Sequence, residues 1–179
     1  MSDSNTVTKF KWIWAWQDNA EEKWLRQMSL SGLHLYSVDF AGVYTFTKGP
    51  PHDYVYRLDY RQNTRENDAE YLQLFEDAGW ERISNFASWH YFRKEPMPGE
   101  EAEIFTDVDS RVAKYKRVLT VLLVVAPTTV LLLLIAAWER DIPGIALMFL
   151  LLGSVLLVLY LIAFVKLVRK INRIKKLRE

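Results

Sequence analysis

The pattern of hydrophobic and polar residues changes near residue 105. Before it, aromatic and charged residues follow one another every few positions, whereas residues 118–165 consist mainly of Leu, Val and Ile. Residues 118–138 contain no charged side chain, and residues 142–165 form a second uncharged stretch. About 20 apolar residues in a helix are enough to cross the hydrocarbon core of a bilayer. The pattern therefore predicts two transmembrane helices, over 118–138 and 142–165, and their short connector makes them an antiparallel hairpin.

Basic residues flank the hairpin at both of its outer ends. Four lie between residues 111 and 117, and seven follow the second span, whereas the connector contains Arg140 alone. Because flanks rich in Lys and Arg stay in the cytoplasm, this asymmetry predicts a two-pass inner-membrane protein with a cytoplasmic N-terminus and C-terminus. Residues 106–117 are predicted to form a juxtamembrane helix.

The tail, residues 166–179, repeats apolar residues every three or four positions, with basic residues between them. This spacing predicts a basic amphipathic helix, which either lies on anionic lipid headgroups or pairs with the juxtamembrane helix. The candidate lipid-contacting residues are Lys166, Arg169, Lys170, Arg173, Lys175 and Lys176.

Residues 9–105 have the pattern of one cytosolic domain, after a polar lead, residues 1–8, that is predicted to be disordered. Alternating residues predict a strand over 9–16, and Asp18 is a candidate cap for a helix over 19–31. Strands follow over 34–40 and 43–48. After Pro50 and Pro51 the same order recurs, with a strand over 54–60, a helix over 68–78, and strands over 81–86 and 89–94.

The recurrence is also visible in the residues themselves. The letters FAGVYTFTK, from Phe40, match FASWHYFRK, from Phe86, at an offset of 46, and Gly32 matches Gly79 at an offset of 47. We interpret this as a tandem duplication of a β-α-β-β unit, over residues 9–48 and 54–94, although chance similarity of two aromatic hairpins is the alternative. The predicted fold is α+β, with one sheet and two helices on one face in two layers, followed by the transmembrane hairpin.

Aromatic residues line the predicted strands. Trp12, Trp14 and Trp16 alternate along the first strand, and Tyr54 and Tyr56 share a face of the strand after the prolines. Such surfaces are either core or a concave site for flat, apolar or cationic molecules. The candidate ligand-binding residues are therefore Trp12, Trp14, Trp16, Tyr54, Tyr56 and Trp89.

Charge and composition exclude several classes of function. Residues 1–105 carry a net charge of −6 and residues 106–179 one of +7, so the domain is a poor direct binder of nucleic acid. The chain has no cysteine, and its three histidines lack the spacing of a metal site. Glu21 and Glu22 are interpreted as first-turn helix carboxylates. Asp59 is interpreted as a partner in a surface or interdomain ion pair. No catalytic motif, metal site or cofactor site is predicted, so we do not expect an enzyme.

Several segments resemble those of DUF2812, a family of bacterial membrane proteins of unknown function. They are, in order, KWIWAW from Lys11, EEKWL from Glu21, YVYRLDYR from Tyr54, YLQLFEDAGW from Tyr71, WHYFRK from Trp89 and EIFTD from Glu103. The resemblance implies a cytosolic domain ahead of transmembrane helices in a bacterial inner membrane, in genes often found beside PadR-like regulators.

The leading hypothesis is a membrane-anchored cytosolic sensor or adaptor. Its domain would bind a partner protein, such as a PadR-like regulator or another membrane subunit, or a small lipophilic ligand. The alternatives are a subunit of a homo-oligomeric transport or resistance complex and a structural scaffold that binds no ligand. The sequence does not decide among them.

Overall fold

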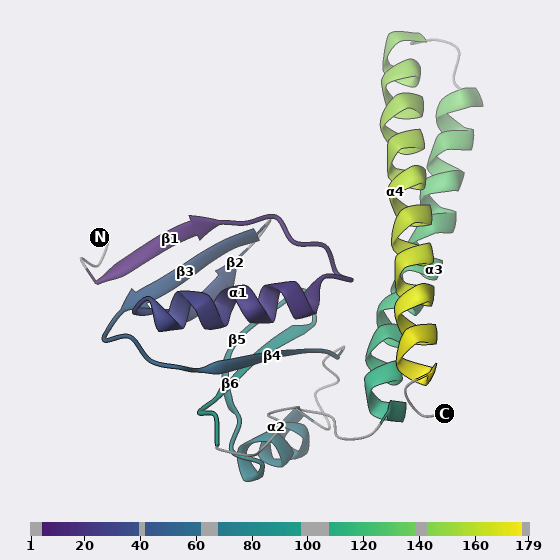
Figure 1. Ribbon diagram of the computed structural model, residues 1–179. Coiled ribbons are helices and arrows are strands. Elements are labelled where there is room, and N and C mark those ends of the chain that lie inside the picture. Colours follow the sequence, from purple (N-terminus) through teal and green to yellow (C-terminus); the bar gives the residue numbers. More distant parts are fainter. Residues whose placement is uncertain (1–4, 40–41, 62–67, 98–107, 139–142, 177–179) are drawn as a thin grey trace. The chain divides into compact units, whose positions relative to one another are not determined.

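Figure 1 shows the computed structural model of the protein, which describes residues 5–39, 42–61, 68–97, 108–138 and 143–176. The chain forms two compact units, Met1–Thr106 and Asp107–Glu179. The first is an α+β domain, and the second consists of two long apolar helices packed together.

The first unit contains the β-α-β-β order twice, as the duplication predicts. Its elements are β1 (Thr6–Phe10), α1 (Asp18–Leu30), β2 (Leu33–Asp39), β3 (Val43–Lys48), β4 (Val55–Tyr60), α2 (Asp68–Asp77), β5 (Glu81–Phe86) and β6 (Trp89–Lys94). Most bounds agree with the sequence pattern within one residue.

The first strand lies earlier in the chain than the pattern indicates. β1 begins at Thr6, so residues 6–8 form strand instead of a disordered lead, and it ends at Phe10. The reason is where β3 begins: its first residue, Val43, pairs with Phe10. Among the described residues, no strand therefore continues this pairing beside residues 11–16. The three tryptophans therefore lie in the segment that joins β1 to α1.

Each repeat forms its own sheet, in place of the single sheet predicted. The strand orders are β1-β3-β2 and β4-β6-β5, both antiparallel. The two sheets meet where β2 lies beside β5, and the amide of Val38 donates a hydrogen bond to Oγ of Ser84 across this junction (3.1 Å). In each sheet the middle strand is the last strand of the repeat, so the two repeats have the same topology.

Matching contacts in the two repeats confirm the duplication. The amide of Lys11 donates to the carbonyl of Gly42 and the amide of Arg61 to that of Ser88, both at 2.9 Å. In addition, the Lys11 ammonium lies 4.4 Å from the ring centroid of Trp24, and the Arg61 guanidinium lies 4.2 Å from that of Tyr71. Chance similarity of two hairpins would not place a cation on the helix aromatic in both repeats.

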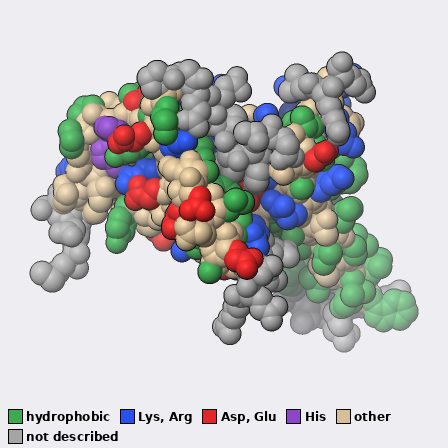
Figure 2. All heavy atoms as spheres, turned by 90° about the horizontal axis from the view of Figure 1, so that it is seen from below, with side chains coloured by type: hydrophobic (Ala, Val, Ile, Leu, Met, Phe, Trp, Pro, Cys, Tyr) green, Lys and Arg blue, Asp and Glu red, His purple; other side chains and the backbone are tan. Residues whose placement is uncertain are grey.

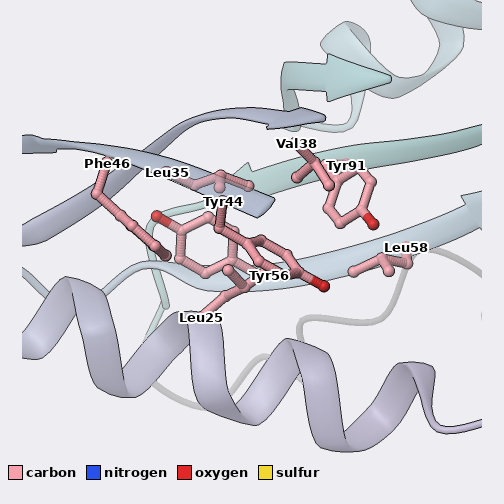
Figure 3. Packing of buried hydrophobic residues seen from close by; sticks show 8 residues of the cluster. All are labelled: Leu25, Leu35, Val38, Tyr44, Phe46, Tyr56, Leu58 and Tyr91. Carbon is pink, nitrogen blue, oxygen red and sulfur yellow. The ribbon is translucent and has the colours of Figure 1, made fainter. Parts of the chain in front are cut away.

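The main core lies between α1 and strands of both sheets (Figure 3). Leu25 of α1 is completely buried in it, so α1 holds the two repeats together. The cluster consists of Leu25, Leu35, Val38, Tyr44, Phe46, Tyr56, Leu58 and Tyr91.

A second cluster surrounds α2, and it lies on the other face of β4. Val55 packs with Tyr71 and Phe75 of α2, whereas the next residue, Tyr56, packs with Leu25 of α1. Neighbouring residues of a strand point to opposite faces. The two helices therefore cover opposite faces of β4, and the prediction that both lie on one face is wrong.

The second unit is a helical hairpin of α3 (Val108–Trp138) and α4 (Pro143–Lys176), which lie side by side along their length (Figure 1). Both helices are long and apolar enough to cross a membrane. Residues 108–117 of the predicted juxtamembrane helix form the first part of α3, and residues 166–176 of the predicted tail continue α4. The rest of these two predicted segments, 106–107 and 177–179, lies outside the described residues. A Cβ atom added at Gly153 would overlap the side chain of Leu133, so α4 approaches α3 closely at this glycine.

The apolar stripe of the tail faces the hairpin. Leu167, Ile171 and Ile174 are buried, and the ammonium of Lys170 lies 4.6 Å from the ring centroid of Tyr115 in α3. Residues 166–176 of the tail thus pack against the first part of α3, and lipid contact of the tail stays a prediction. Five of the six candidate lipid-contacting residues remain exposed, namely Lys166, Arg169, Arg173, Lys175 and Lys176.

Candidate functional site

A pocket of about 200 Å³ lies at the junction of the two repeats. One side comes from the segment before α1 and its first turn, another from β2 and β3, and a third from β5, β6 and the turn between them. Its described lining residues are Ile13, Trp14, Ala15, Asp18, Glu21, Val38, Gly42, Tyr44, Phe86, Ala87, Trp89 and Tyr91.

Glu21 is a polar residue of the pocket that connects the two repeats. Its carboxylate oxygen Oε1 accepts hydrogen bonds from the hydroxyls of Tyr44 (2.7 Å) and Tyr91 (2.9 Å). Tyr44 belongs to the first repeat and Tyr91 to the second, so one oxygen atom connects both. The side chain is 6% exposed, although it lies in the first turn of a helix.

Burial is the main cause of the pKa shifts in this cluster. It raises the pKa of Glu21, because a carboxylate loses hydration there, and the two tyrosine hydrogen bonds oppose this shift. Nearby Asp18 raises the pKa further, whereas Lys11 lowers it. Burial and the neighbouring carboxylate also raise the pKa of both tyrosines, which stay protonated donors at physiological pH.

Asp18 is the second acidic residue of the lining. It was expected to cap α1, but the cap position is held by Gln17, and no side-chain hydrogen bond caps the helix there. Gln17 instead accepts a hydrogen bond from the amide of Trp14 through Oε1 (3.1 Å). Asp18 is the first helical residue and is 1% exposed. The two carboxylates, three residues apart, are therefore on one side of the helix.

Aromatic side chains form much of the remaining wall. Trp14 and Trp89, two of the predicted ligand-binding residues, both line the pocket, together with Phe86. Trp14 stacks on Trp16 with a centroid distance of 5.1 Å and an interplanar angle of 6°. Trp16, which does not line the pocket, thus supports the ring of Trp14 in the pocket wall.

The other four predicted residues lie elsewhere. Trp12 is 56% exposed and packs edge-on against Trp14, and Trp16 supports Trp14 without lining the pocket. Tyr54 packs between His34 and His52, and Tyr56 is part of the main core. The aromatic surface thus divides between core and pocket.

Sequence reasoning missed the polar residues of the pocket. Glu21 has the position of an ordinary first-turn carboxylate, and Tyr44 and Tyr91 belong to two different hairpins. No local motif connects them, because they meet only when the repeats pack together. The repeat alignment contained one signal of the contact between Glu21 and Tyr44. In the second repeat, Asp68 corresponds to Glu21 and His90 to Tyr44, and burial lowers the pKa of His90, which the charge of Asp68 opposes.

Two more acidic residues are buried outside the pocket. Asp59, expected in a surface or interdomain ion pair, is 1% exposed and accepts a hydrogen bond from the hydroxyl of Tyr71 (2.9 Å). Glu22 accepts a hydrogen bond from the amide of Leu58 (3.0 Å), and its Oε2 lies 3.6 Å from Nη1 of Arg57. Both join a helix to β4, which is a structural role. Among the described residues, no three His, Cys, Asp or Glu side chains are placed to hold a metal ion.

The two units also differ in the side chains of their visible surfaces. Figure 2 shows acidic side chains with basic ones among them on the visible face of the domain, and mainly basic charged side chains next to hydrophobic ones on the hairpin. This agrees with the opposite net charges of the two parts of the chain.

Comparison with known proteins matches residues 17–126 to the family described as protein of unknown function, DUF2812. The matched segment begins one residue before α1 and ends inside α3, so it includes Asp18, Glu21, Tyr44 and Tyr91 but not the tryptophans before α1. No curated protein and no solved structure matches the chain. Because the match covers more than half of the chain, the protein belongs to the DUF2812 family.

Proposed function

We propose that the protein is a membrane-anchored sensor or adaptor whose cytosolic domain binds a small lipophilic ligand in the pocket between the repeats. The observation that carries the proposal is the pocket itself. It combines aromatic walls with a few converging polar groups, which is the composition of small-molecule sites in general. Its two repeats both contribute to the lining, so an occupant would contact both at once.

The hairpin supplies the anchor in this proposal. In the most apolar stretches of α3 and α4, 6% and 11% of the residues are buried, whereas the core helices of a soluble protein are mostly buried. Exposed Leu, Val and Ile at this density need a hydrophobic surrounding. The basic flanks favour a two-pass orientation in a bacterial inner membrane, with both chain ends in the cytoplasm.

A ligand that contacts both repeats can change how they pack, and such a change can be passed to a partner. The exposed basic residues of the tail, listed above, would contact anionic lipids, and the acidic domain would meet a partner of complementary charge. The proposed partner is a PadR-like regulator or another membrane subunit.

The absence of cysteine allows a direct test of orientation. Single cysteines at Asp141 in the connector and Asn172 in the tail are treated with a membrane-impermeant maleimide in intact spheroplasts. We expect Asp141→Cys to react at once and Asn172→Cys to react only after the membrane is permeabilised. Reaction of Asn172→Cys in intact spheroplasts would overturn the proposed orientation.

The ligand-binding part is tested on the tagged full chain, purified in gentle detergent and analysed by native mass spectrometry. We expect the wild type to carry a small molecule that Trp89→Ala loses. Trp12→Ala is the matched control, because Trp12 is an exposed tryptophan that does not line the pocket, and it should keep the molecule. A wild type without a bound molecule, or equal retention in both variants, would contradict the proposal.

The same preparation identifies co-purifying proteins. Recovery of a PadR-like regulator or of another membrane subunit supports the adaptor. A discrete oligomer without any partner supports the alternative of a homo-oligomeric unit.

A further inference from the structure

We infer that the pocket between the repeats selects a small organic cation with an aromatic or otherwise apolar body. This inference rests on the proposed ligand-binding function and names the chemical class of the ligand. Three observations carry it: the charge of the lining, the aromatic walls and the volume.

The charge of the lining is entirely acidic. Among the described lining residues, Asp18 and Glu21 are acidic and none is basic. Both tyrosines bind the same oxygen of Glu21, Oε1, so neither of these two hydrogen bonds occupies Oε2. In surroundings of low dielectric, a buried carboxylate gains far more from a positive neighbour than it would in water. A cation gains from such a lining, whereas an anion entering it is repelled.

Lys11 is not a cation that occupies the pocket beside Glu21. Its field acts on Glu21, but its ammonium lies over the ring of Trp24 and the residue is not part of the lining. Burial lowers the pKa of Lys11, which weakens it as a permanent counter-ion.

The walls supply the second half of the recognition. Trp14, Phe86 and Trp89 present ring surfaces, and the faces of aromatic rings attract cations by about 0.5–2 kcal/mol. The protein itself already places Lys11 on Trp24 and Arg61 on Tyr71 in this domain. A ligand with an apolar body and a positive charge would contact rings and carboxylates together.

The volume limits the size of the ligand. A cavity of about 150 Å³ is known to accept benzene. The pocket has about 200 Å³. It is therefore suited to a bicyclic ring or a molecule of similar size.

The test compares two ligands of nearly the same shape. 1-Methylquinolinium carries a permanent positive charge, and 1-methyl-2-quinolone is the uncharged lactam of the same ring. Binding of each to the full chain in nanodiscs of uncharged lipid is measured by calorimetry at pH 8, with empty nanodiscs as the blank. We expect the wild type to bind the cation about tenfold or more tightly than the lactam, as a charge-assisted contact requires.

The matched variants are Glu21→Gln and Glu22→Gln. The first removes the charge of Glu21 but keeps an amide oxygen that can accept from both tyrosine hydroxyls. The fold should therefore persist, which near-UV circular dichroism will show. The second removes the same charge one position along α1, outside the lining. Glu21→Gln should reduce the preference for the cation, although Asp18 and the aromatic walls remain in the lining, whereas Glu22→Gln should keep the full preference of the wild type.

The outcomes separate this inference from the proposed function. If the wild type binds both ligands equally, or the lactam more tightly, the cation class is wrong while the ligand site stands. The same conclusion follows if Glu21→Gln keeps the preference of the wild type undiminished. If neither ligand binds, the proposed ligand site itself fails.

Discussion

The hydroxyl of Tyr91, in the second repeat, donates a hydrogen bond to Oε1 of Glu21, in the first, across 2.9 Å. The two residues are 70 positions apart in the chain. The contact is buried and it joins the last strand of one repeat to the helix of the other. The pocket therefore depends on the packing of the two repeats and is absent from either one alone.

Tyr91→Phe removes this hydroxyl and leaves the ring. We expect the free energy of unfolding to fall by about 1–3 kcal/mol, because a buried carboxylate loses one of its two tyrosine donors. Denaturant unfolding followed by near-UV circular dichroism at pH 8 measures the change. Tyr36→Phe is the control, because Tyr36 is exposed and its hydroxyl should contribute little. Equal effects of both variants would show that the buried hydrogen bond adds nothing.

The raised pKa of Glu21 gives stability a definite pH dependence. A folded-state pKa above the ordinary value of 4.5 means that the folded protein holds this proton more tightly than the unfolded chain. The stabilising contribution is therefore complete below pH 4.5 and is lost as the pH rises through the folded-state pKa. Relative to Glu21→Gln, the wild type should lose unfolding free energy over this range.

The comparison with Glu21→Gln isolates the effect of one group. Asp53 has a pKa lowered by its hydrogen bonds with Arg26, which gives the opposite sign, but it is present in both proteins and cancels in the difference. Unfolding midpoints at pH values from 4.5 to 9 are compared for the two proteins. A difference that stays constant over this range would contradict the assignment.

Gly32 and Gly79 are equivalent residues that should respond differently to alanine. Both have φ of +80°, so Ala is strained at either by about 1–2 kcal/mol. At Gly32 a Cβ would in addition lie 2.5 Å from the carbonyl oxygen of Gly49, whereas at Gly79 it would meet the flexible side chain of Lys94 at 3.3 Å. Gly32→Ala should therefore lower the unfolding midpoint more than Gly79→Ala. Equal midpoints would refute the close backbone approach.

Close packing of the hairpin at Gly153 makes a separate prediction. Gly153→Leu should push α4 away from α3, because its side chain would occupy the space of Leu133. Small residues at such contacts let helices approach closely. Gly144→Leu is the control, because a Cβ at that position meets nothing within 4 Å. Thermal loss of helical circular dichroism in detergent should occur at a lower temperature in Gly153→Leu than in the control.

Local pattern was sufficient for most elements of the fold. The helix over Asp68–Asp77 and the strands Glu81–Phe86 and Trp89–Lys94 follow the predicted positions, because periodicity, turn residues and Gly79 act within a few residues. The first strand differed because its length is set by the start of β3, which no local pattern records. The aromatic alternation of residues 11–16 indicated a strand, but among the described residues no strand pairs with this segment.

The candidate site was predictable in part. Trp14 and Trp89 were identified because aromatic residues on a predicted strand are a visible signal in the sequence, but the same signal selected Tyr56, which is core. The carboxylates were not identified, because burial of Asp18 and Glu21 comes from the strands that cover the start of α1.

The sequence by itself determined the duplication, the two apolar helices, the opposite charges of the two parts and the family. Each of these depends on composition or on spacing along the chain, which tertiary contacts do not change. Only the tertiary structure decided that the repeats form two sheets, that α1 and α2 cover opposite faces of β4, and that Glu21 meets Tyr44 and Tyr91. The physical reason is that burial and hydrogen bonding depend on distances in space, and residues 70 positions apart acquire a distance only when the chain folds.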